Sequence, residues 1–392
     1  MEKLWKYKKI GEVCIVERGA SPRPIDKYIT DNESGINWIK IGDTSDSMYI
    51  TETAQKIIVE GMKKSRYVKP GDFLLSNSMS FGRPYILKID GCIHDGWLVL
   101  RDENALFDKR FLYYYLSSKT TYKKLKSMAV GGVVNNLNSE MVRNVIVPVP
   151  DKEEQSEIAD LFDKIKKILD DRKQELEQLD TLVKSRFVEM FGDIITGKYN
   201  YKIRKLGDVA FIGSSHRVFT TEFVESGIPF YRGTEIGELA NGIEPSEPYY
   251  ISEEHYNKLT KDNTKPRIGD LLMPSICNKG QIWMVDTDRP FYYKDGRVLC
   301  ISPNRDIFNS KYLEYFMRIK TLVEYPKLGS GSTCAEFKIF LLKDMDVLVP
   351  PRNVQNQFAD FVASVDKSKS KIQKSLEETQ LLFDSLMQKY FG

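Results

Sequence analysis

Residues 147–192 read VPVPDKEEQSEIADLFDKIKKILDDRKQELEQLDTLVKSRFVEMFG, and residues 347–392 read VLVPPRNVQNQFADFVASVDKSKSKIQKSLEETQLLFDSLMQKYFG. The two segments align without a gap at an offset of 200 residues. Gln155 matches Gln355, and both segments end in Phe-Gly. A chain whose second half repeats the pattern of its first half in this way contains a tandem duplication.

Each copy predicts a strand that leads into a long helix. Pro148 and Pro150 favour extended backbone, and no proline follows until Pro229. After Pro150, apolar residues recur at intervals of three and four, which is the a/d pattern of a coiled coil. About 35 residues at ~1.5 Å each give a rod on the order of 50 Å long. The predicted seam consists of Ile158, Phe162, Ile165, Leu169, Leu176, Leu179 and Val183 in the first copy, and of Phe358, Val362, Val365, Ile372, Leu376 and Phe383 in the second.

The two seams have complementary interruptions. Arg172 interrupts the first seam where the second copy has Ile372, and Lys369 interrupts the second seam where the first copy has Leu169. We infer that the helices pack on each other within one chain, with Arg172 against Ile372 and Lys369 against Leu169. The alternative is two unrelated amphipathic helices, each on its own domain, but the gap-free register favours the pair.

The composition is that of an ordinary globular protein, and it excludes several classes. No apolar run approaches the ~20 residues that span a bilayer, and the N-terminal MEKLWKYKKIGEV lacks the apolar core of a secretory signal. We therefore expect a cytoplasmic protein. Only three histidines are present, which disfavours a metal site. The cysteines are odd in number, form no CxxC pair and are predicted to be reduced and buried: Cys14, Cys92, Cys277, Cys300 and Cys334.

Charge is unevenly placed along the chain. The net charge is +3, whereas residues 151–192 carry −4 and residues 351–392 carry +1. The remaining residues must therefore carry +6. A mildly basic pair of globular parts beside a neutral-to-acidic rod is compatible with local nucleic-acid patches.

The duplication predicts four parts: globular domains at 1–150 and 193–350, and helices at 151–192 and 351–392. The first domain shows many short strand patterns between Gly/Pro turns, among them 13–17, 36–43, 67–76 and 94–101, and one clear helix at 107–118. This pattern predicts an irregular α+β domain. The second domain repeats the order, with 228–236 in place of 36–43 and 308–317 in place of the helix.

Turn residues are retained between the repeats while loop residues diverge. Ile10-Gly11-Glu12-Val13 recurs as Leu206-Gly207-Asp208-Val209, and Asp95-Gly96 recurs as Asp295-Gly296. A duplication that keeps its framework and changes its loops favours two sites that do one job on two different targets.

No sequence signature of catalysis is present. The chain lacks Asn-Pro-Pro-Tyr, Asp-Pro-Pro-Tyr, a glycine-rich cofactor loop and GxxxxGK[ST], and its histidines are too scattered for a nucleophile set. Asp72 and Asp270 follow glycines, which allows a reading as nuclease carboxylates. A Gly-Asp pair before an apolar strand is more often a turn, because glycine supplies positive φ and Asp bonds nearby backbone.

Taken together, these features resemble the specificity subunit of a type I restriction–modification enzyme. The resemblance covers essentially the whole chain and rests on the order of parts, on the strand-to-helix junctions at 147–159 and 347–359, and on the openings at 10–13 and 206–209. The first junction keeps the Glu-Gln of the family's Pro-Leu-Pro-x-x-Glu-Gln pattern, whereas Val354-Gln355 loses the Glu. In that family the globular parts are target recognition domains and the helices are conserved spacer regions.

The resemblance implies a non-catalytic DNA-recognition protein. Each domain would read one half of a bipartite double-stranded DNA target, and an antiparallel, intramolecular helix pair would set the gap between the halves. The helices would also dock two methyltransferase subunits, which carry S-adenosylmethionine; this chain itself would bind no cofactor and no metal. Restriction subunits, which translocate and cleave DNA, would join that core.

The resemblance places the DNA contacts on loops that carry Arg, Lys, Asn, Ser, His and Gln, which match base edges and phosphates. Tyr113–Tyr115 could be read as a platform that stacks bases, but a helix that buries its aromatic face is the preferred interpretation. The predicted DNA-binding residues are Ser21, Arg23, Lys40, Asn77, Ser80 and Arg83 in the first domain, and Ser215, His216, Arg217, Arg232, Asn278, Lys279 and Gln281 in the second.

Two other hypotheses remain open at this point. The chain could be a coiled-coil scaffold that holds two protein-interaction domains and does not bind DNA. It could also be the specificity half of a fused restriction enzyme that is expressed separately.

Overall fold

The computed structural model describes residues 5–77, 81–129, 136–262, 265–328 and 335–392. The chain forms two compact units. Unit 1 comprises residues 1–174 and 373–392, and unit 2 comprises residues 175–372. Each unit therefore combines one globular part with a piece of each long helix. Among the described residues, no helix has the length and apolarity needed to cross a lipid bilayer.

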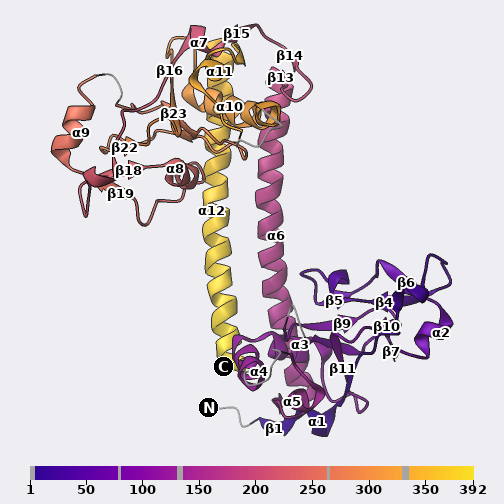
Figure 1. The fold of residues 1–392 in the computed structure, drawn as a ribbon. Helices are drawn as coiled ribbons and strands as arrows, with labels where there is room; N and C mark the ends of the chain where they lie inside the picture. The colour runs from indigo at the N-terminus through magenta and orange to yellow at the C-terminus, as the bar shows by residue number, and fades with distance from the viewer. Residues whose placement is uncertain (1–4, 78–80, 130–135, 263–264, 329–334) are drawn as a thin grey trace. The chain divides into compact units, whose positions relative to one another are not determined.

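The two long helices are α6 (Lys152–Phe191) and α12 (Arg352–Phe391) (Figure 1). Both begin just after the prolines that close the preceding strand, because a proline discourages helix in the residue before it. Their bounds differ by 200 residues, as the alignment of the repeats requires. The mixed α and β fold with long helices is therefore confirmed.

In unit 1 the first part of α6 packs against the last part of α12. The Phe162 ring is fully buried, and its centroid lies 5.4 Å from that of Phe383 and 5.6 Å from that of Phe391. The Tyr390 ring lies 6.1 Å from Phe162. Ring pairs at these separations add about 0.5–1.5 kcal/mol each beyond the area they bury.

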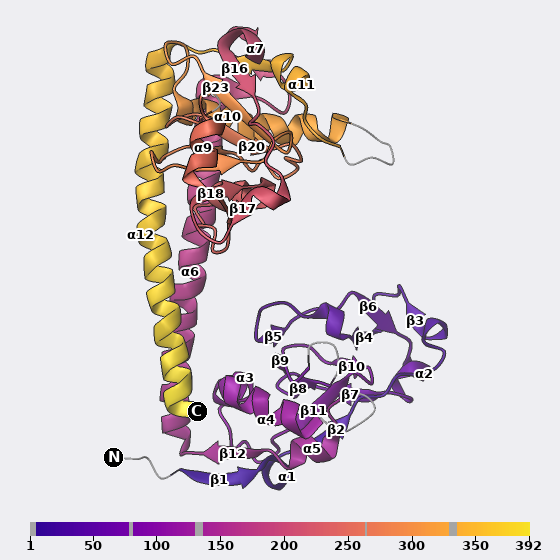
Figure 2. The same ribbon diagram turned by 60° about the vertical axis from the view of Figure 1, so that its left-hand side comes forward.

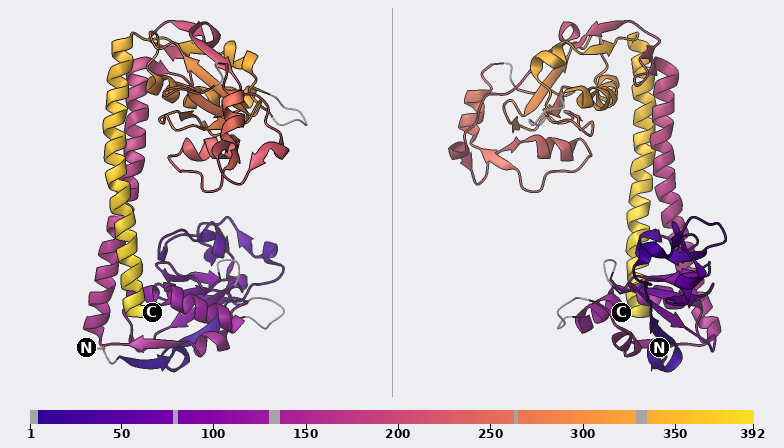
Figure 3. Two further views of the ribbon diagram at one scale, coloured as in Figure 1. Left: turned by 90° about the vertical axis from the view of Figure 1, so that its left-hand side faces the viewer. Right: turned by 45° about the vertical axis from the view of Figure 1, so that its right-hand side comes forward.

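In unit 2 the last part of α6 packs against the first part of α12 (Figure 3). The Phe187 and Phe358 rings lie 5.3 Å apart, and Lys369 Nζ lies 2.7 Å from Asp180 Oδ1. Residues that come later in α6 therefore meet residues that come earlier in α12, so these two segments run antiparallel. The prediction that Lys369 lies against Leu169 is wrong. An antiparallel pair brings together mirrored positions of the repeat, and Asp180 pairs with the lysine.

The predicted seam is an apolar stripe that turns away from solvent along both helices. Leu169 is 6% exposed, and Val183 is 7% exposed. The buried seam residues are Ile158, Phe162, Ile165, Leu169, Val183, Phe358, Val362 and Val365, and the half-buried ones are Leu176, Leu179, Ile372, Leu376 and Phe383.

The globular part of unit 1 is built on two five-stranded sheets. Their orders are β2-β11-β8-β9-β5 and β3-β6-β4-β10-β7, and β1 pairs with β12 separately. One buried cluster draws side chains from both larger sheets. The strands are β1 (Lys6–Lys9), β2 (Ile15–Arg18), β3 (Ile29–Thr30), β4 (Ile36–Ile39), β5 (Tyr49–Ile50), β6 (Gln55–Ile57), β7 (Arg66–Val68), β8 (Phe73–Ser76), β9 (Pro84–Leu87), β10 (Gly91–Ile93), β11 (Trp97–Arg101) and β12 (Ile146–Val149). The helices are α1 (Ile10–Val13), η1 (Ile25–Lys27), η2 (Ile41–Asp43), α2 (Val59–Met62), α3 (Lys109–Ser117), α4 (Lys119–Ala129) and α5 (Ser139–Arg143).

Unit 2 repeats this plan with four-stranded sheets. Their orders are β16-β23-β20-β21 and β17-β19-β18-β22, and β15 pairs with β24 as β1 pairs with β12. The strands are β13 (Gly192–Asp193), β14 (Lys198–Tyr199), β15 (Ile203–Lys205), β16 (Ala210–Gly213), β17 (Phe223–Val224), β18 (Ile228–Tyr231), β19 (Tyr249–Ile251), β20 (Leu271–Pro274), β21 (Trp283–Met284), β22 (Tyr292–Tyr293), β23 (Val298–Pro303) and β24 (Asp346–Leu348). The helices are α7 (Leu206–Val209), η3 (Thr220–Glu222), α8 (Gly233–Leu239), α9 (Glu253–Leu259), α10 (Ser310–Glu324), η4 (Tyr325–Leu328) and α11 (Ile339–Lys343).

Some predicted strands begin later than expected or end in a helix. The strand predicted at 13–17 is preceded by the one-turn helix α1 and begins at Ile15. Ile10 and Val13 are both buried, and residues three apart share a face of a helical turn. The stretch 228–236 is a strand only to Tyr231, and then continues as α8. In the first repeat, 36–43 ends in the shorter 3₁₀ turn η2.

The turn reading of the two Gly-Asp pairs is confirmed. Gly71 has φ +91° and Gly269 has φ +83°, a region that favours glycine. The Asp72 carboxylate accepts a hydrogen bond of 3.0 Å from the backbone N–H of Lys69. Asp270 accepts the equivalent bond of 2.9 Å from Arg267. Both carboxylates therefore stabilise the backbone of the turn in which they lie.

Buried thiols and the buried aromatic face of α3 are also as predicted. Cys14, Cys92, Cys277 and Cys300 are free and buried, and Cys334 lies outside the described residues. Burial raises the pKa of the Cys14 thiol to about 12, so it stays protonated near neutral pH. On α3, Tyr114 and Tyr115 are buried. The Tyr114 hydroxyl donates a hydrogen bond of 2.6 Å to Asp163 of α6.

A buried glutamine joins each globular part to its long helix. In unit 1, Gln155 is fully buried, and its Oε1 accepts a hydrogen bond of 2.8 Å from the backbone N–H of Asp108. Its Nε2 donates to the carbonyls of Leu106 at 3.1 Å and Pro150 at 2.9 Å. One side chain therefore ties together the residue before α3, the end of β12 and the start of α6.

Gln355 makes the same three bonds in unit 2. Its Oε1 accepts from the backbone N–H of Asn309 at 2.9 Å, and its Nε2 donates to the carbonyls of Ile307 and Pro350 at 2.9 and 2.8 Å. The glutamine that the two repeats share is thus a structural anchor. Its surroundings explain why glutamine fits here: an amide both donates and accepts, and each of its atoms has a backbone partner.

Candidate nucleic-acid interface

In unit 1, three predicted DNA-binding residues bind the same residue, Asp95. Ser21 Oγ donates a hydrogen bond of 2.8 Å to Asp95 Oδ1, and Arg23 Nη2 lies 3.2 Å from Asp95 Oδ2. Asn77 Nδ2 donates to the backbone carbonyl of Asp95 at 2.8 Å. The pKa of Asp95 lies below its ordinary value, chiefly because of the hydrogen bond from Ser21. Asp95 is therefore a charged carboxylate that orients an arginine.

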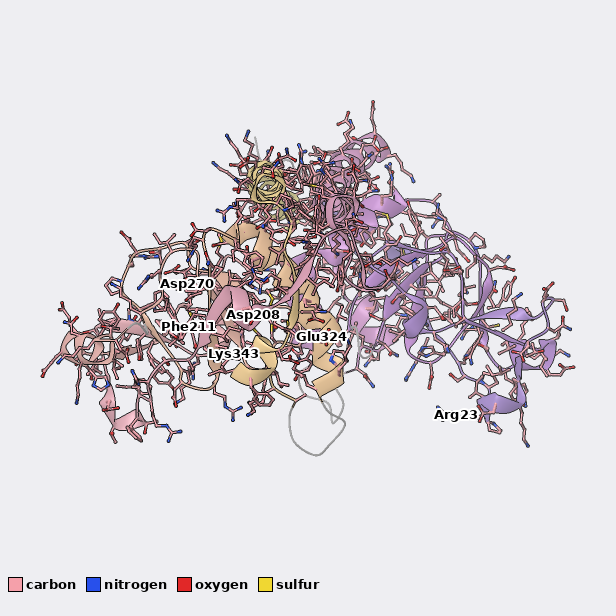
Figure 4. All side chains as sticks on the ribbon, turned by 90° about the horizontal axis from the view of Figure 1, so that it is seen from above. Arg23, Asp208, Phe211, Asp270, Glu324 and Lys343 are labelled. Atoms are coloured by element: carbon pink, nitrogen blue, oxygen red, sulfur yellow. The ribbon has the colours of Figure 1, made fainter. Side chains whose placement is uncertain are left out.

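The members of this cluster differ in how they face solvent. The side chain of Arg23 is 81% exposed, and it stands at the edge of its unit in Figure 4. Asn77 is only 1% exposed. Arg23 can therefore reach a ligand directly, whereas Asn77 holds the backbone that carries Asp95.

The loop that presents Ser21 and Arg23 needs a glycine to pass close to its neighbour. The N–H of Gly19 donates to the carbonyl of Trp97 at 2.9 Å. A Cβ at Gly19 would lie 2.1 Å from the carbonyl oxygen of His94, which no side chain tolerates. The glycine thus lets the loop lie directly against the residues before β11.

Unit 2 holds an equivalent arginine–aspartate pair. Arg217 Nε lies 3.3 Å from Asp295 Oδ2, and the Arg217 side chain is 68% exposed. Ser215 Oγ donates to the carbonyl of Tyr293. His216 Nε2 lies 2.6 Å from Asp262 Oδ2. Ser215 and Arg217 therefore contact the end of β22 and the residues just after it, whereas the His216 ring contacts Asp262, which follows α9.

Asp95 and Asp295 were missing from the predicted set. The sequence does contain a pattern that could indicate them, since Asp-Gly recurs at 95–96 and at 295–296. In both repeats a Ser-x-Arg segment supplies the arginine that this Asp binds. The shared element is thus a pair of residues far apart in the sequence, which only the fold brings together.

Lys40 and Arg232 lie on other loops and have partners of their own. Lys40 Nζ donates to Gln55 Oε1 at 2.8 Å. Arg232 forms an ion pair with Glu235, and its guanidinium lies 4.5 Å from the centre of the Tyr249 ring. Burial alone would raise the pKa of Glu235, but the hydrogen bonds from Arg232 bring it below its ordinary value.

The remaining predicted residues occupy two loops. Arg83 Nη2 lies 3.1 Å from Asp46 Oδ1, and its guanidinium lies over the Tyr85 ring at 5.4 Å. Asn278 and Lys279 are exposed, and the N–H of Lys279 donates to Gln281 Oε1 at 3.0 Å. Ser80 lies outside the described residues.

In the candidate interface each predicted arginine therefore lies against a carboxylate, and the side chains of Arg23 and Arg217 are the most exposed of them. Such groups suit phosphate oxygens and base edges. Within the described ranges, no group of three or more His, Cys, Asp and Glu residues could hold a metal ion.

Comparison with known proteins gives three similarities. The family model described as "Type I restriction modification DNA specificity domain" matches residues 2–179. The type I restriction enzyme MjaIX specificity subunit of Methanocaldococcus jannaschii is 22% identical, over 99% of this chain and 92% of that protein. The MjaVIII specificity subunit of the same organism is 22% identical, over 95% of this chain and 90% of that protein.

Two solved structures have a similar fold. One comes from a study of complex assembly and conformational transition of the type I restriction–modification system; its TM-score is 0.64 at 18% identity, over 99% of this chain and 97% of that one. The other is the S subunit of a type I restriction–modification system from M. genitalium, with a TM-score of 0.54 at 14% identity, over 99% of this chain and 96% of that one.

Proposed function

Because this chain belongs to the family of type I restriction–modification specificity subunits, we propose that it reads the DNA target of such a complex and performs no catalysis itself. The observation that carries the proposal is the arginine–aspartate pair that recurs at Arg23 and Asp95 and at Arg217 and Asp295. Each globular part reads one half of a bipartite target, and the antiparallel helix pair, an intramolecular coiled coil, sets the spacing between the halves.

The repeat also divides the roles of the predicted residues. Two different half-sites share only the phosphate backbone, so the residues that both repeats keep serve the phosphates. Arg23 and Arg217 are therefore phosphate contacts. The residues that differ between repeats, such as Arg83 and Gln281, serve the base edges. Phosphate contacts position a protein, and base contacts give it specificity.

The long helices bind two methyltransferase subunits, which bring S-adenosylmethionine. Large apolar side chains that face solvent mark protein interaction sites when they gather in patches. Leu381 of α12 is 70% exposed, and its neighbour Leu382 is 51% exposed. Such a pair on a helix whose apolar seam is already covered supports a second apolar contact.

The test of DNA reading is a domain exchange. Residues 1–150 are replaced by those of a relative with a different target, and the modified bases are mapped by methylome sequencing. We expect one half of the target to change, with the other half and the spacer retained. An unchanged target overturns the proposal. If the wild-type chain with its methyltransferase also shows no sequence-selective DNA binding at moderate salt, the scaffold hypothesis replaces it.

Substitution of Leu381 and Leu382 by Asp should weaken the binding of methyltransferase by at least tenfold. Two exposed leucines contribute about 1.5–3 kcal/mol each when a partner buries them, and a charge in that position adds a desolvation cost. Co-purification and titration calorimetry measure the change. The matched control is Lys371→Asp with Lys374→Asp, on the same helix. Equal affinity of the leucine variant and the wild type would contradict the docking site.

A further inference from the structure

A groove of about 810 Å³ lies in unit 1 between the loop at 81–84 and the helices α3 and α4. Helix α3 contacts both β9 and α4, and both helices belong to the globular part of unit 1 (Figure 2). Aromatic side chains form its walls: Phe81 from the loop, Tyr113 from α3 and Tyr122 from α4. The Phe81 and Tyr122 rings meet edge to face at 6.3 Å. Neither the predicted DNA-binding set nor the arginine–aspartate pairs include the part of this groove that α4 forms.

Every charged side chain that lines the groove is a cation: Arg83, Lys119, Lys123 and Lys126. Arg83 pairs with Asp46, whose side chain is fully exposed, and Lys119 pairs with Asp384 at 2.8 Å. Lys123 and Lys126 are exposed and have no ion pair within the part of the chain that the structure describes. The groove therefore has an excess of positive charge.

The lysines lie in a row on one face of α4. Lys119, Lys123 and Lys126 are spaced by four and three residues, so they share one side of the helix. The row extends about 10 Å along the helix axis at ~1.5 Å per residue. One strand of duplex DNA carries a phosphate every ~3.4 Å along its axis, so the row matches about three successive phosphates.

The loop at 81–84 connects this row to the proposed DNA-reading surface. Gly82 has φ +70°, and a Cβ there would lie 3.4 Å from Leu125 Cδ1. Leu125 is fully buried, so the loop packs directly on α4. Arg83, which we assign to the reading of bases, is part of the same loop and lines the groove.

The corresponding region of the second repeat has a different structure. There α10 runs from Ser310 to Glu324 without the break that separates α3 from α4. Lys320 and Lys327 both pair with Glu324, at 3.0 and 3.1 Å. Lys320 of α10 and Lys327 of η4 thus share a carboxylate, whereas Lys123 and Lys126 have none in the described residues.

We propose that the groove between the loop at 81–84 and α4 binds the sugar–phosphate backbone of DNA beside the first half-site. Lys123 and Lys126 contact phosphates, and Tyr122 packs against the sugars between them. This inference rests on the proposed function. The two repeats then differ in their DNA contacts, because unit 1 contacts a longer stretch of the DNA backbone than unit 2 does.

The experiment compares the full chain with the double variant Lys123→Ala, Lys126→Ala, each with its methyltransferase. Affinity is measured between 50 and 200 mM salt, for a duplex with the mapped target and for an unrelated duplex. Each phosphate contact contributes about 0.9 to the slope of log K against log salt. We expect the slope of the variant to be less steep than that of the wild type by about 1.8 on both duplexes. Between 50 and 200 mM salt, the affinity of the wild type should therefore fall by a factor roughly ten times larger than the affinity of the variant does.

The matched control is Lys6→Ala with Lys8→Ala, which removes two exposed lysines from β1 of the same unit. Its slope should equal that of the wild type. An unchanged slope for the α4 variant, while the wild type still binds its target selectively, overturns the groove alone. Loss of methyltransferase binding with an unchanged DNA slope also overturns it, and assigns the groove to the partner protein. If the wild type itself shows no selective DNA binding, the proposed function is overturned, and not the groove alone.

Discussion

Substitution of Gln155 by alanine should destabilise the protein by about 3 kcal/mol or more, which is a large part of the 5–15 kcal/mol that a domain has. The change leaves the half-buried N–H of Asp108, the half-buried carbonyl of Leu106 and the buried carbonyl of Pro150 without their partner. Each unsatisfied buried group costs about 1–3 kcal/mol, and the residual cavity adds to this. Urea unfolding followed by circular dichroism measures the difference.

The duplication supplies an internal replicate of this experiment. Gln355→Ala removes the same three hydrogen bonds from unit 2 and should cost a similar amount. Gln174→Ala is the control, since Gln174 is an exposed residue of α6, and its loss should change stability by less than about 0.5 kcal/mol. If Gln155→Ala were as stable as Gln174→Ala, the buried amide would not be the anchor.

The second large effect is expected for Phe162→Ala, at about 3–5 kcal/mol. Phe162 is fully buried, and its ring contacts rings of α12 and the Tyr114 ring of α3, whose centre lies 5.0 Å away. Removal of the ring therefore leaves a cavity where α3, α6 and α12 meet. Thermal or urea unfolding of the full chain reports the loss.

The equivalent position of the other repeat provides the comparison. Val362 occupies it, and is 4% exposed. Val362→Ala removes only two methyl groups and should cost about 1–2 kcal/mol, at the transfer value of ~0.8 kcal/mol per carbon plus a small cavity. A loss for Phe162→Ala no greater than that for Val362→Ala would show that the aromatic cluster adds little.

The parts of the fold that follow from local pattern were predictable. The prolines at 148–150 and the spacing of apolar residues after them located α6, and the repeat located α12. The buried stripe followed from the same spacing. The identity of facing residues did not follow, because the register of an antiparallel pair depends on how the helices are connected. Lys369 shows this, since it meets Asp180 and not Leu169.

The candidate site was predictable only as a set of loops. Arg23 and Arg217 could be named because arginines on predicted loops suit DNA, and the structure shows that both are exposed. Their carboxylate partners lie more than seventy residues away along the chain, and no local pattern links them. Asn77 looked like a loop residue in the sequence but is buried. Its burial depends on the packing of β8 and β11, which residue types alone do not reveal.

One feature of unit 1 bears on how the protein is made. The unit closes only when residues 373–392 join residues 1–174, because the Phe391 ring packs against Phe162 and Phe111. The ribosome adds residues 175–372 between them, which takes on the order of 10–40 s at about 5–20 residues per second. During that time the aromatic surface around Phe162 lacks its cover. A nascent chain in this state is a substrate for chaperones, and a message that ends early yields a product whose first half stays open to aggregation and proteolysis.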